Sequence, residues 1–353
     1  MLSLQKQKGN FYLFISLTLF LLIVMPSCKR IQAMEVRTQR PAKVTITSEI
    51  KKIVIVNRSK GRVTSILEGI LTGESPEKDK LLAEECLRGL EQTLAKSERF
   101  TIARHDQTLQ AATGASLQFG APLDWETVNQ ICTQYGADAV LALEFFDSDY
   151  SVTNLTKPED LQGKILTNQD GTPIFYAKGT ANASAGFRLY HNAKKNIAYS
   201  DYYKYTRNWT EQANTVIEAA AKIIKGNDAI KLVSYDNGVA FAKSIVPLYY
   251  WEDRSMFLSK EFDSQKAQRQ ALAGDWETAA ITWEGAYNRL FDSKEKGEAA
   301  YNLALTYEVL GDLEKAKFWI RESYTLTGNK KALYYAEIID GLIADQERLE
   351  NQK

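Results

Sequence analysis

The sequence predicts a mixed α/β or α+β domain, built on a sheet with covering helices, that is followed by an all-helical repeat region. Over residues 49–255, short apolar runs typical of buried strands alternate with stretches of helical periodicity, as expected for a sheet covered by helices. Over residues 256–348, helical periodicity continues and a short motif recurs. A chain of 353 residues is long enough to bury a core in each of two such domains.

The first half of the α/β domain alternates strands and helices. Leu82, Cys86 and Leu90 recur at intervals of four residues, which predicts a helix with one apolar face. Asp124 is placed to cap the start of a second helix and Gly136 to end it. The elements expected in this half are a strand at 51–59, a helix at 79–96, a strand at 99–103, a helix at 125–135 and a strand at 139–143.

The second half of this domain is expected to contain a long loop and a hairpin. Residues 148–175 hold prolines and glycines without periodicity, which predicts a loop. From Ala177 the residues alternate between small apolar and polar, and a tyrosine-rich partner strand follows from Ile197. The small alanine face suits close packing of a helix. Two helices, at 210–225 and 229–245, are expected to supply that cover.

The helical region carries a repeated motif. The sequence Ala-Gly-Asp-Trp-Glu at 273–277 recurs as Leu-Gly-Asp-Leu-Glu at 310–314. With the alanines and large apolar residues that follow each copy, it resembles the tetratricopeptide repeat, in which paired helices bind partner proteins along a concave face. Carried over to this chain, the resemblance places Tyr301, Leu305 and Glu308 in that partner-binding groove. A final helix at about 330–347 would cap the pair.

The N-terminus indicates a secreted, lipid-anchored protein. Lys6 and Lys8 precede a short apolar segment at 11–25, which is too short to cross a bilayer as a helix and is typical of a signal peptide at 1–27. Met25-Pro26-Ser27-Cys28 then resembles a bacterial lipobox. That resemblance implies acylation of Cys28 and attachment to a lipid membrane. An ordinary signal peptide followed by an incidental cysteine remains the alternative.

The residues after Cys28 form a basic segment. Residues 28–62 contain ten bases and two acids, and the part before the first expected strand, 28–48, is interpreted as a tether. Such a tether is attracted to an anionic lipid surface, which stabilises membrane binding, or it is simply a solvated linker that its charge keeps extended. Both interpretations stay open.

Composition excludes several classes of function. The 44 basic residues equal the 44 acidic ones, whereas a nucleic-acid binder needs surplus positive charge. Three cysteines and two histidines are too few for a metal cage of such ligands, and no phosphate-binding loop or hydrolase motif is present. We therefore expect no metal, no cofactor and no enzyme. Cys86 and Cys132 could pair after export, but core packing is the favoured interpretation.

One turn is the best candidate for a ligand site. Asn57, Arg58, Ser59 and Lys60 form the polar turn in which the first predicted strand ends, and ligands of open sheets bind beyond the carboxyl ends of strands. The two bases could accept a carboxylate or an anionic glycan. The competing interpretation is a capped turn with exposed bases.

Several short segments resemble an uncharacterised family of Bacteroidota lipoproteins. They are Ile53–Ser59, Ser97–Phe100, Tyr135–Leu141, Gly238–Ala242 and Ile245–Pro247. The strand–helix–strand order is also distantly similar to lipoproteins of curli secretion and penicillin-binding-protein activation, which are assembly and regulatory factors. The resemblance implies a non-enzymatic scaffold for an envelope protein partner, on the periplasmic side of the outer membrane. Basic residues after Cys28, in place of an acidic export signal, favour that side. The alternative is an envelope hydrolase or a solute- or glycan-binding protein with a pocket near Asn57.

Overall fold

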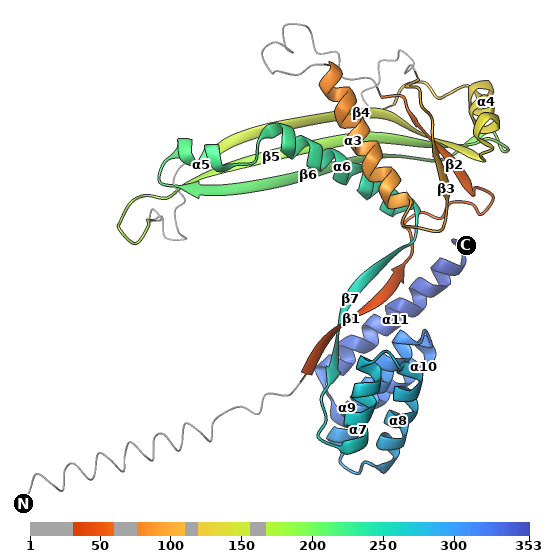
Figure 1. The fold of residues 1–353 in the computed structure, drawn as a ribbon, viewed down its shortest axis with the longest axis vertical. Coiled ribbons are helices and arrows are strands. Elements are labelled where there is room, and N and C mark those ends of the chain that lie inside the picture. Colours follow the sequence, from red (N-terminus) through yellow and green to blue (C-terminus); the bar gives the residue numbers. More distant parts are fainter. Residues whose placement is uncertain (1–30, 60–75, 110–118, 156–166) are drawn as a thin grey trace, which may run out of the picture. The chain divides into compact units, whose positions relative to one another are not determined.

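The computed structural model describes residues 31–59, 76–109, 119–155 and 167–353, and the chain forms two compact units (Figure 1). We call Gln39–Tyr250 with Asp345–Lys353 the sheet unit, and the part up to Thr38 with Trp251–Ala344 the helical unit. The predicted signal peptide and Cys28 lie outside the described residues. Within the described ranges, no helix has the length and apolarity needed to cross a membrane.

The sheet unit is built on a five-stranded mixed sheet of order β3-β2-β4-β5-β6. β2 runs parallel to both β3 and β4, and β4, β5 and β6 form antiparallel pairs. The strands are β2 Lys52–Asn57, β3 Thr101–Arg104, β4 Ala139–Leu155, β5 Phe175–His191 and β6 Asn196–Ala213. Together with the helices that follow, this confirms the mixed sheet with covering helices that the sequence predicted.

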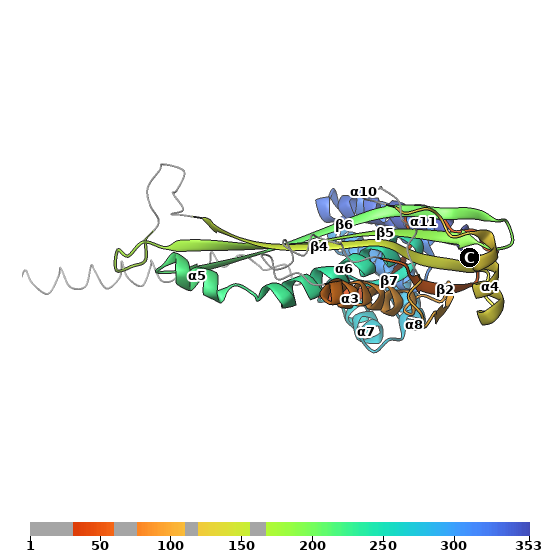
Figure 2. The ribbon, with the colours of Figure 1, turned by 90° about the horizontal axis from the view of Figure 1, so that it is seen from above.

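Helices cover both faces of this sheet. Successive strand residues point to opposite sides, and in β2 the residues on both sides are apolar and buried. Ile53 and Ile55 share a core with α3 (Pro76–Leu94) and α6 (Gly226–Ile245). Val54 and Val56 pack instead with α4 (Trp125–Tyr135). Figure 2 shows α6 and the short helix α5 (Val216–Lys222) following the length of the long strands, whereas α3 crosses these strands obliquely in Figure 1.

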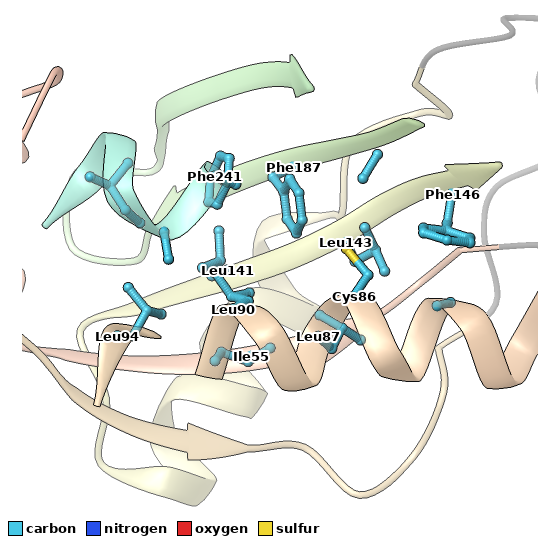
Figure 3. Packing of buried hydrophobic residues seen from close by; sticks show 14 of the residues in the cluster. Ile55, Cys86, Leu87, Leu90, Leu94, Leu141, Leu143, Phe146, Phe187 and Phe241 are labelled. Atoms are coloured by element: carbon cyan, nitrogen blue, oxygen red, sulfur yellow. The ribbon is translucent and has the colours of Figure 1, made fainter. Parts of the chain in front are cut away.

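The face under α3 and α6 holds the main core of the unit. Figure 3 shows side chains of α3 reaching the strands, among them Cys86 and Leu90. Phe241 of α6 stacks on Phe187 of β5, with ring centroids 4.0 Å apart. The alanines of β5 line this face, as expected, and leave room for α6.

The backbones of α3 and α6 touch where they cross. An ideal Cβ added to Gly238 would lie 1.9 Å from the carbonyl oxygen of Cys86, and one added to Gly89 would lie 2.1 Å from that of Tyr235. Real Cβ atoms do not approach other atoms so closely. Glycine at both positions is therefore a condition of this helix packing.

The loop expected at 148–175 is shorter than the sequence indicated. β4 continues to Leu155 and β5 begins at Phe175. Likewise, β6 continues to Ala213 across the start of a predicted helix, so only Val216–Lys222 is helical there. These strand ends are polar because one face of the sheet is solvated there, which hides the apolar alternation on which the prediction depended.

Over its described residues, the helical unit combines a small sheet with five helices. Strands β1 and β7 pair in a two-stranded sheet, so part of the segment interpreted as a tether is a strand. The elements are β1 Ile31–Arg40, β7 Leu248–Phe257, α7 Phe262–Leu272, α8 Trp276–Arg289, α9 Ser293–Val309, α10 Leu313–Thr327 and α11 Lys330–Glu350. Three of them, β1, β7 and α11, extend past the limits of the unit. The predicted C-terminal run of helices is confirmed.

The repeated motif builds the same turn twice. Gly274 and Gly311 have φ angles of +86° and +80°, a conformation that glycine adopts without strain. The aspartate after each glycine caps the next helix: Asp275 accepts from the Thr278 amide at 3.2 Å and Asp312 from the Lys315 amide at 3.1 Å. In each copy of the motif, the glycine thus ends one helix and the aspartate starts the next.

We predict that Gly238→Ala destabilises the sheet unit by about 1–3 kcal/mol or more, because the new methyl group forces α3 and α6 apart. The matched control is Gly341→Ala in α11, where an added Cβ meets no atom within 4 Å. That variant should gain about 0.5–1 kcal/mol from helix propensity. Urea unfolding of both variants is the measurement, and equal midpoints would contradict the close crossing.

Candidate functional site

The turn predicted as a ligand site is occupied by its own hydrogen bonds. Asn57 ends β2 and is 3% exposed; its amide nitrogen donates to Glu84 at 2.7 Å. Its side-chain oxygen accepts from the amide and the hydroxyl of Ser59, at 3.0 and 2.7 Å. This is the capped turn that the sequence left as the alternative. Lys60 lies outside the described residues.

Arg58 is buried rather than exposed, and it meets a carboxylate. Its Nη1 lies 2.6 Å from Glu144 of β4, and both side chains are almost fully buried. Its Nη2 donates to the carbonyl of Ala121 at 3.3 Å, while Nε has no partner among the residues that the structure describes. Glu144 sits where the pairing of β4 with β5 shifts register, a bulge that directs its side chain to this face.

Two further residues complete this buried cluster. The Tyr190 hydroxyl donates to Glu144 and accepts from the Leu123 amide, and burial together with Glu144 raises the pKa of Tyr190 to about 12. Arg188 donates to the carbonyl of Gly120 at 2.8 Å. The cluster therefore fastens the segment 119–123 to the sheet. We interpret it as a structural clamp, and the sequence signal for it was one glutamate inside an apolar strand.

The two cysteines of the sheet unit are free and buried. Cys86 belongs to the core under α3 and α6, whereas Cys132 belongs to the core under α4 on the opposite face. A disulfide between them is incompatible with this arrangement. Burial raises the pKa of both thiols, that of Cys132 to about 11, so neither is a nucleophile at neutral pH.

The residues expected to face a partner groove in the helical unit are mostly in its core. Tyr301, Leu305 and Glu308 are 5%, 0% and 7% exposed. Strand β7 lies against this face of α9: Phe257 contacts the Tyr301 ring edge-on at 4.8 Å, and the Asn302 side chain hydrogen-bonds the Phe257 backbone. The expected placement is wrong for Leu305 and Glu308, because the chain fills that face itself.

Glu308 instead anchors a buried ion pair. Arg254 of β7 donates through Nε to both Glu308 oxygens at 3.0 Å and through Nη2 at 2.7 Å, and it also contacts Glu252. These hydrogen bonds raise the pKa of Arg254 although burial lowers it. The hydroxyl of Tyr335 donates to the same carboxylate, and burial, followed by the Glu308 charge, raises the pKa of Tyr335 well above its usual value.

An open groove borders this network. It has a volume of about 380 Å³ and lies between β7 and α11, lined by Asp253–Ser255, Tyr301, Lys330, Lys331, Tyr334, Tyr335 and Ile338. Of the three residues named from the sequence, only Tyr301 lines it. Sequence reasoning missed the lysines and Tyr334, which stand at the start of α11 outside the repeated motif. No group of possible metal ligands occurs among the described residues.

Comparison with known proteins assigns the chain to a family. A model described as "Domain of unknown function (DUF8603)" matches residues 50–257, more than half of the chain. The chain belongs to the DUF8603 family. A second model, "Domain of unknown function (DUF6340)", matches residues 265–341. The DUF8603 match thus ends in β7, and the DUF6340 match lies within the helical unit.

Among curated proteins, none matches the chain. Among solved structures, the PelC dodecamer from Paraburkholderia phytofirmans is 8% identical and covers 62% of this chain and 98% of PelC, with a TM-score of 0.22. A single-residue variant of the same dodecamer is 12% identical, with coverages of 57% and 95% and a TM-score of 0.18. Scores this low support no inference.

We predict that Glu308→Gln destabilises the DUF6340 region by about 3–5 kcal/mol, because it leaves the Arg254 charge buried without its main partner. The double variant Arg254→Met, Glu308→Leu should recover most of that loss. Urea unfolding of the three proteins measures the coupling. A loss below about 0.5 kcal/mol in the single variant would contradict the buried pair.

We also predict that Cys86 and Cys132 of the DUF8603 domain resist thiol reagents in the native protein, since both are buried with raised pKa values. Reaction with a chromogenic disulfide at pH 8 should titrate neither thiol until urea unfolds the domain. A non-reducing, denaturing mass measurement provides the control for a disulfide. Rapid native labelling of either residue would refute its burial.

Proposed function

We propose that the chain is a non-enzymatic envelope lipoprotein that acts as a protein-interaction or assembly scaffold on the periplasmic side of the outer membrane. The observation that carries the interaction role is the groove of the helical unit, which is open and has lysines without ion pairs to the described residues. By contrast, the amide of Asn57 and both terminal nitrogens of Arg58 are engaged internally. The alternative of a hydrolase or glycan binder at Asn57 is therefore less supported.

The anchoring role rests on the sequence around Cys28. The basic residues, the short apolar segment and the cysteine at its end have the order of a lipoprotein signal. Acylation of Cys28 would hold the chain on the membrane through the attached lipid chains. Stable anchoring usually takes two membrane-binding features, such as two acyl chains or one chain with a basic segment. The finer parts of the proposal, namely a lipoprotein of the Bacteroidota type and tetratricopeptide-like repeats, follow from the resemblances described above.

We predict that Cys28→Ala abolishes incorporation of labelled palmitate and moves the protein from the membrane to the soluble fraction. The physical reason is that the largely apolar segment at 11–25, with 15 residues, is too short for a stable span. Cys132→Ala is the matched control, since it removes a cysteine far from the signal. Membrane sedimentation of the Cys28→Ala protein, or palmitate label in it, would refute the lipoprotein assignment.

A further inference from the structure

The groove between β7 and α11 has an excess of positive charge at one end. Lys330 and Lys331 line it from the first turn of α11. That turn contains no acidic residue, although helix starts favour carboxylates. Neither lysine forms an ion pair with the described residues. An anion at this end of the groove would supply the missing partner for both lysines and for the helix dipole.

The floor of the groove offers a hydrogen-bond donor that the fold does not use. Tyr301 is 95% buried, and its ring is fixed between Phe257 and Tyr335, with centroid distances of 4.8 and 5.1 Å. Its hydroxyl has no hydrogen-bond partner among the described residues, whereas the neighbouring Tyr335 hydroxyl donates to Glu308. Although the residue is mostly buried, its hydroxyl oxygen stays accessible in the groove that Tyr301 lines, where a ligand can reach it.

The remaining walls limit what the ligand can be. Tyr334, which is 66% exposed, and Ile338 provide an apolar side. Arg254 is not available to a ligand, because Glu308 and Glu252 already neutralise it. Asp253 adds a negative charge on the β7 side, so an anion is favoured at the lysine end only. A volume of about 380 Å³ admits a few side chains and not a globular surface.

We propose that this groove binds an extended peptide segment of a partner protein that carries an acidic side chain next to an apolar one. The carboxylate contacts Lys330 and Lys331 and accepts a hydrogen bond from Tyr301, and the apolar side chain packs on Tyr334 and Ile338. This inference rests on the proposed function, and it names the chemistry of the partner. Membrane attachment through Cys28 is tested separately, so either proposal can fail while the other stands.

The test measures binding of a labelled peptide to the full chain by fluorescence anisotropy. The probe is Ser-Glu-Leu-Glu-Leu-Glu-Ser with an N-terminal fluorophore, and its matched versions replace each Glu by Gln or by Lys. We expect saturable binding of the Glu peptide, at least tenfold weaker binding of the Gln peptide and none of the Lys peptide. Increasing salt should weaken the Glu complex, because its charges are partly exposed.

Three variants locate the interaction. Tyr301→Phe should weaken binding of the Glu peptide about tenfold, since it removes the hydrogen bond that the hydroxyl donates to the charged carboxylate. Its melting temperature should not change, because the hydroxyl has no partner among the described residues of the fold. The double variant Lys330→Glu, Lys331→Glu should abolish binding. Lys266→Glu, at an exposed lysine of α7 outside the groove, is the control for a charge reversal elsewhere on the unit and should bind normally.

Several outcomes would overturn the proposal. They are the absence of saturable binding at millimolar peptide, equal affinities for the three peptides, and unchanged affinity in Tyr301→Phe or in the double lysine variant. Equal weakening by Lys266→Glu would reduce the effect to unspecific charge and would also overturn it.

Discussion

The backbones of α3 and α6 are in direct contact over one face of the sheet, and most of the sheet unit depends on that contact. Gly89 and Gly238 leave no room for a side chain at the crossing. Because the two helices lie this close, they act as one layer that covers the central strands. The alanines of β5 let this layer approach the sheet, and Phe187 and Phe241 fill the space that remains. The core is therefore set by small residues at a few positions as much as by large ones.

In the helical unit, the two repeats alone would leave one apolar face of α9 uncovered. Strand β7 covers that face of α9 and brings Arg254 into the core. A buried guanidinium is tolerated only with a well-placed carboxylate and further hydrogen bonds, and Glu308, Glu252 and the Asp253 carbonyl provide them. Tyr335 and Tyr301 lie beside this ion pair. The groove exists because β7 covers part of the helical face and leaves the start of α11 open.

Local signals predicted the elements that local interactions determine. Asp124 caps α4 by accepting from the Thr127 amide at 2.8 Å, and Gly136 ends that helix with a φ of 58°, as the sequence indicated. The apolar spacing of Cys86 and Leu90 placed them in the core. The pairing of β1 with β7 had no such local signal, because the two strands lie more than 200 residues apart in the chain. Register over that distance is set by tertiary packing.

The same distinction explains the outcome for the candidate sites. Sequence identified Arg58 by its position after a strand, and that position was right. Its environment was not predictable, since Glu144 becomes its partner only through a bulge in β4 and Ala121 only through the path of another segment.

A binding site is distinguished from a structural cluster by hydrogen-bonding groups that the fold leaves unpaired while solvent or a ligand can still reach them. At the clamp, both terminal nitrogens of Arg58 serve protein acceptors, and the unpaired Nε is sealed from solvent. In the groove, the Tyr301 hydroxyl and the lysines of α11 have no such partners within the described part of the chain, and they face an open space. A ligand could bind Arg58 only by displacing its present hydrogen-bond partners. In the groove, a ligand would pair with donors that are still unpaired. Burial of charge alone therefore does not mark the site in this protein; unpaired donors in an open groove do.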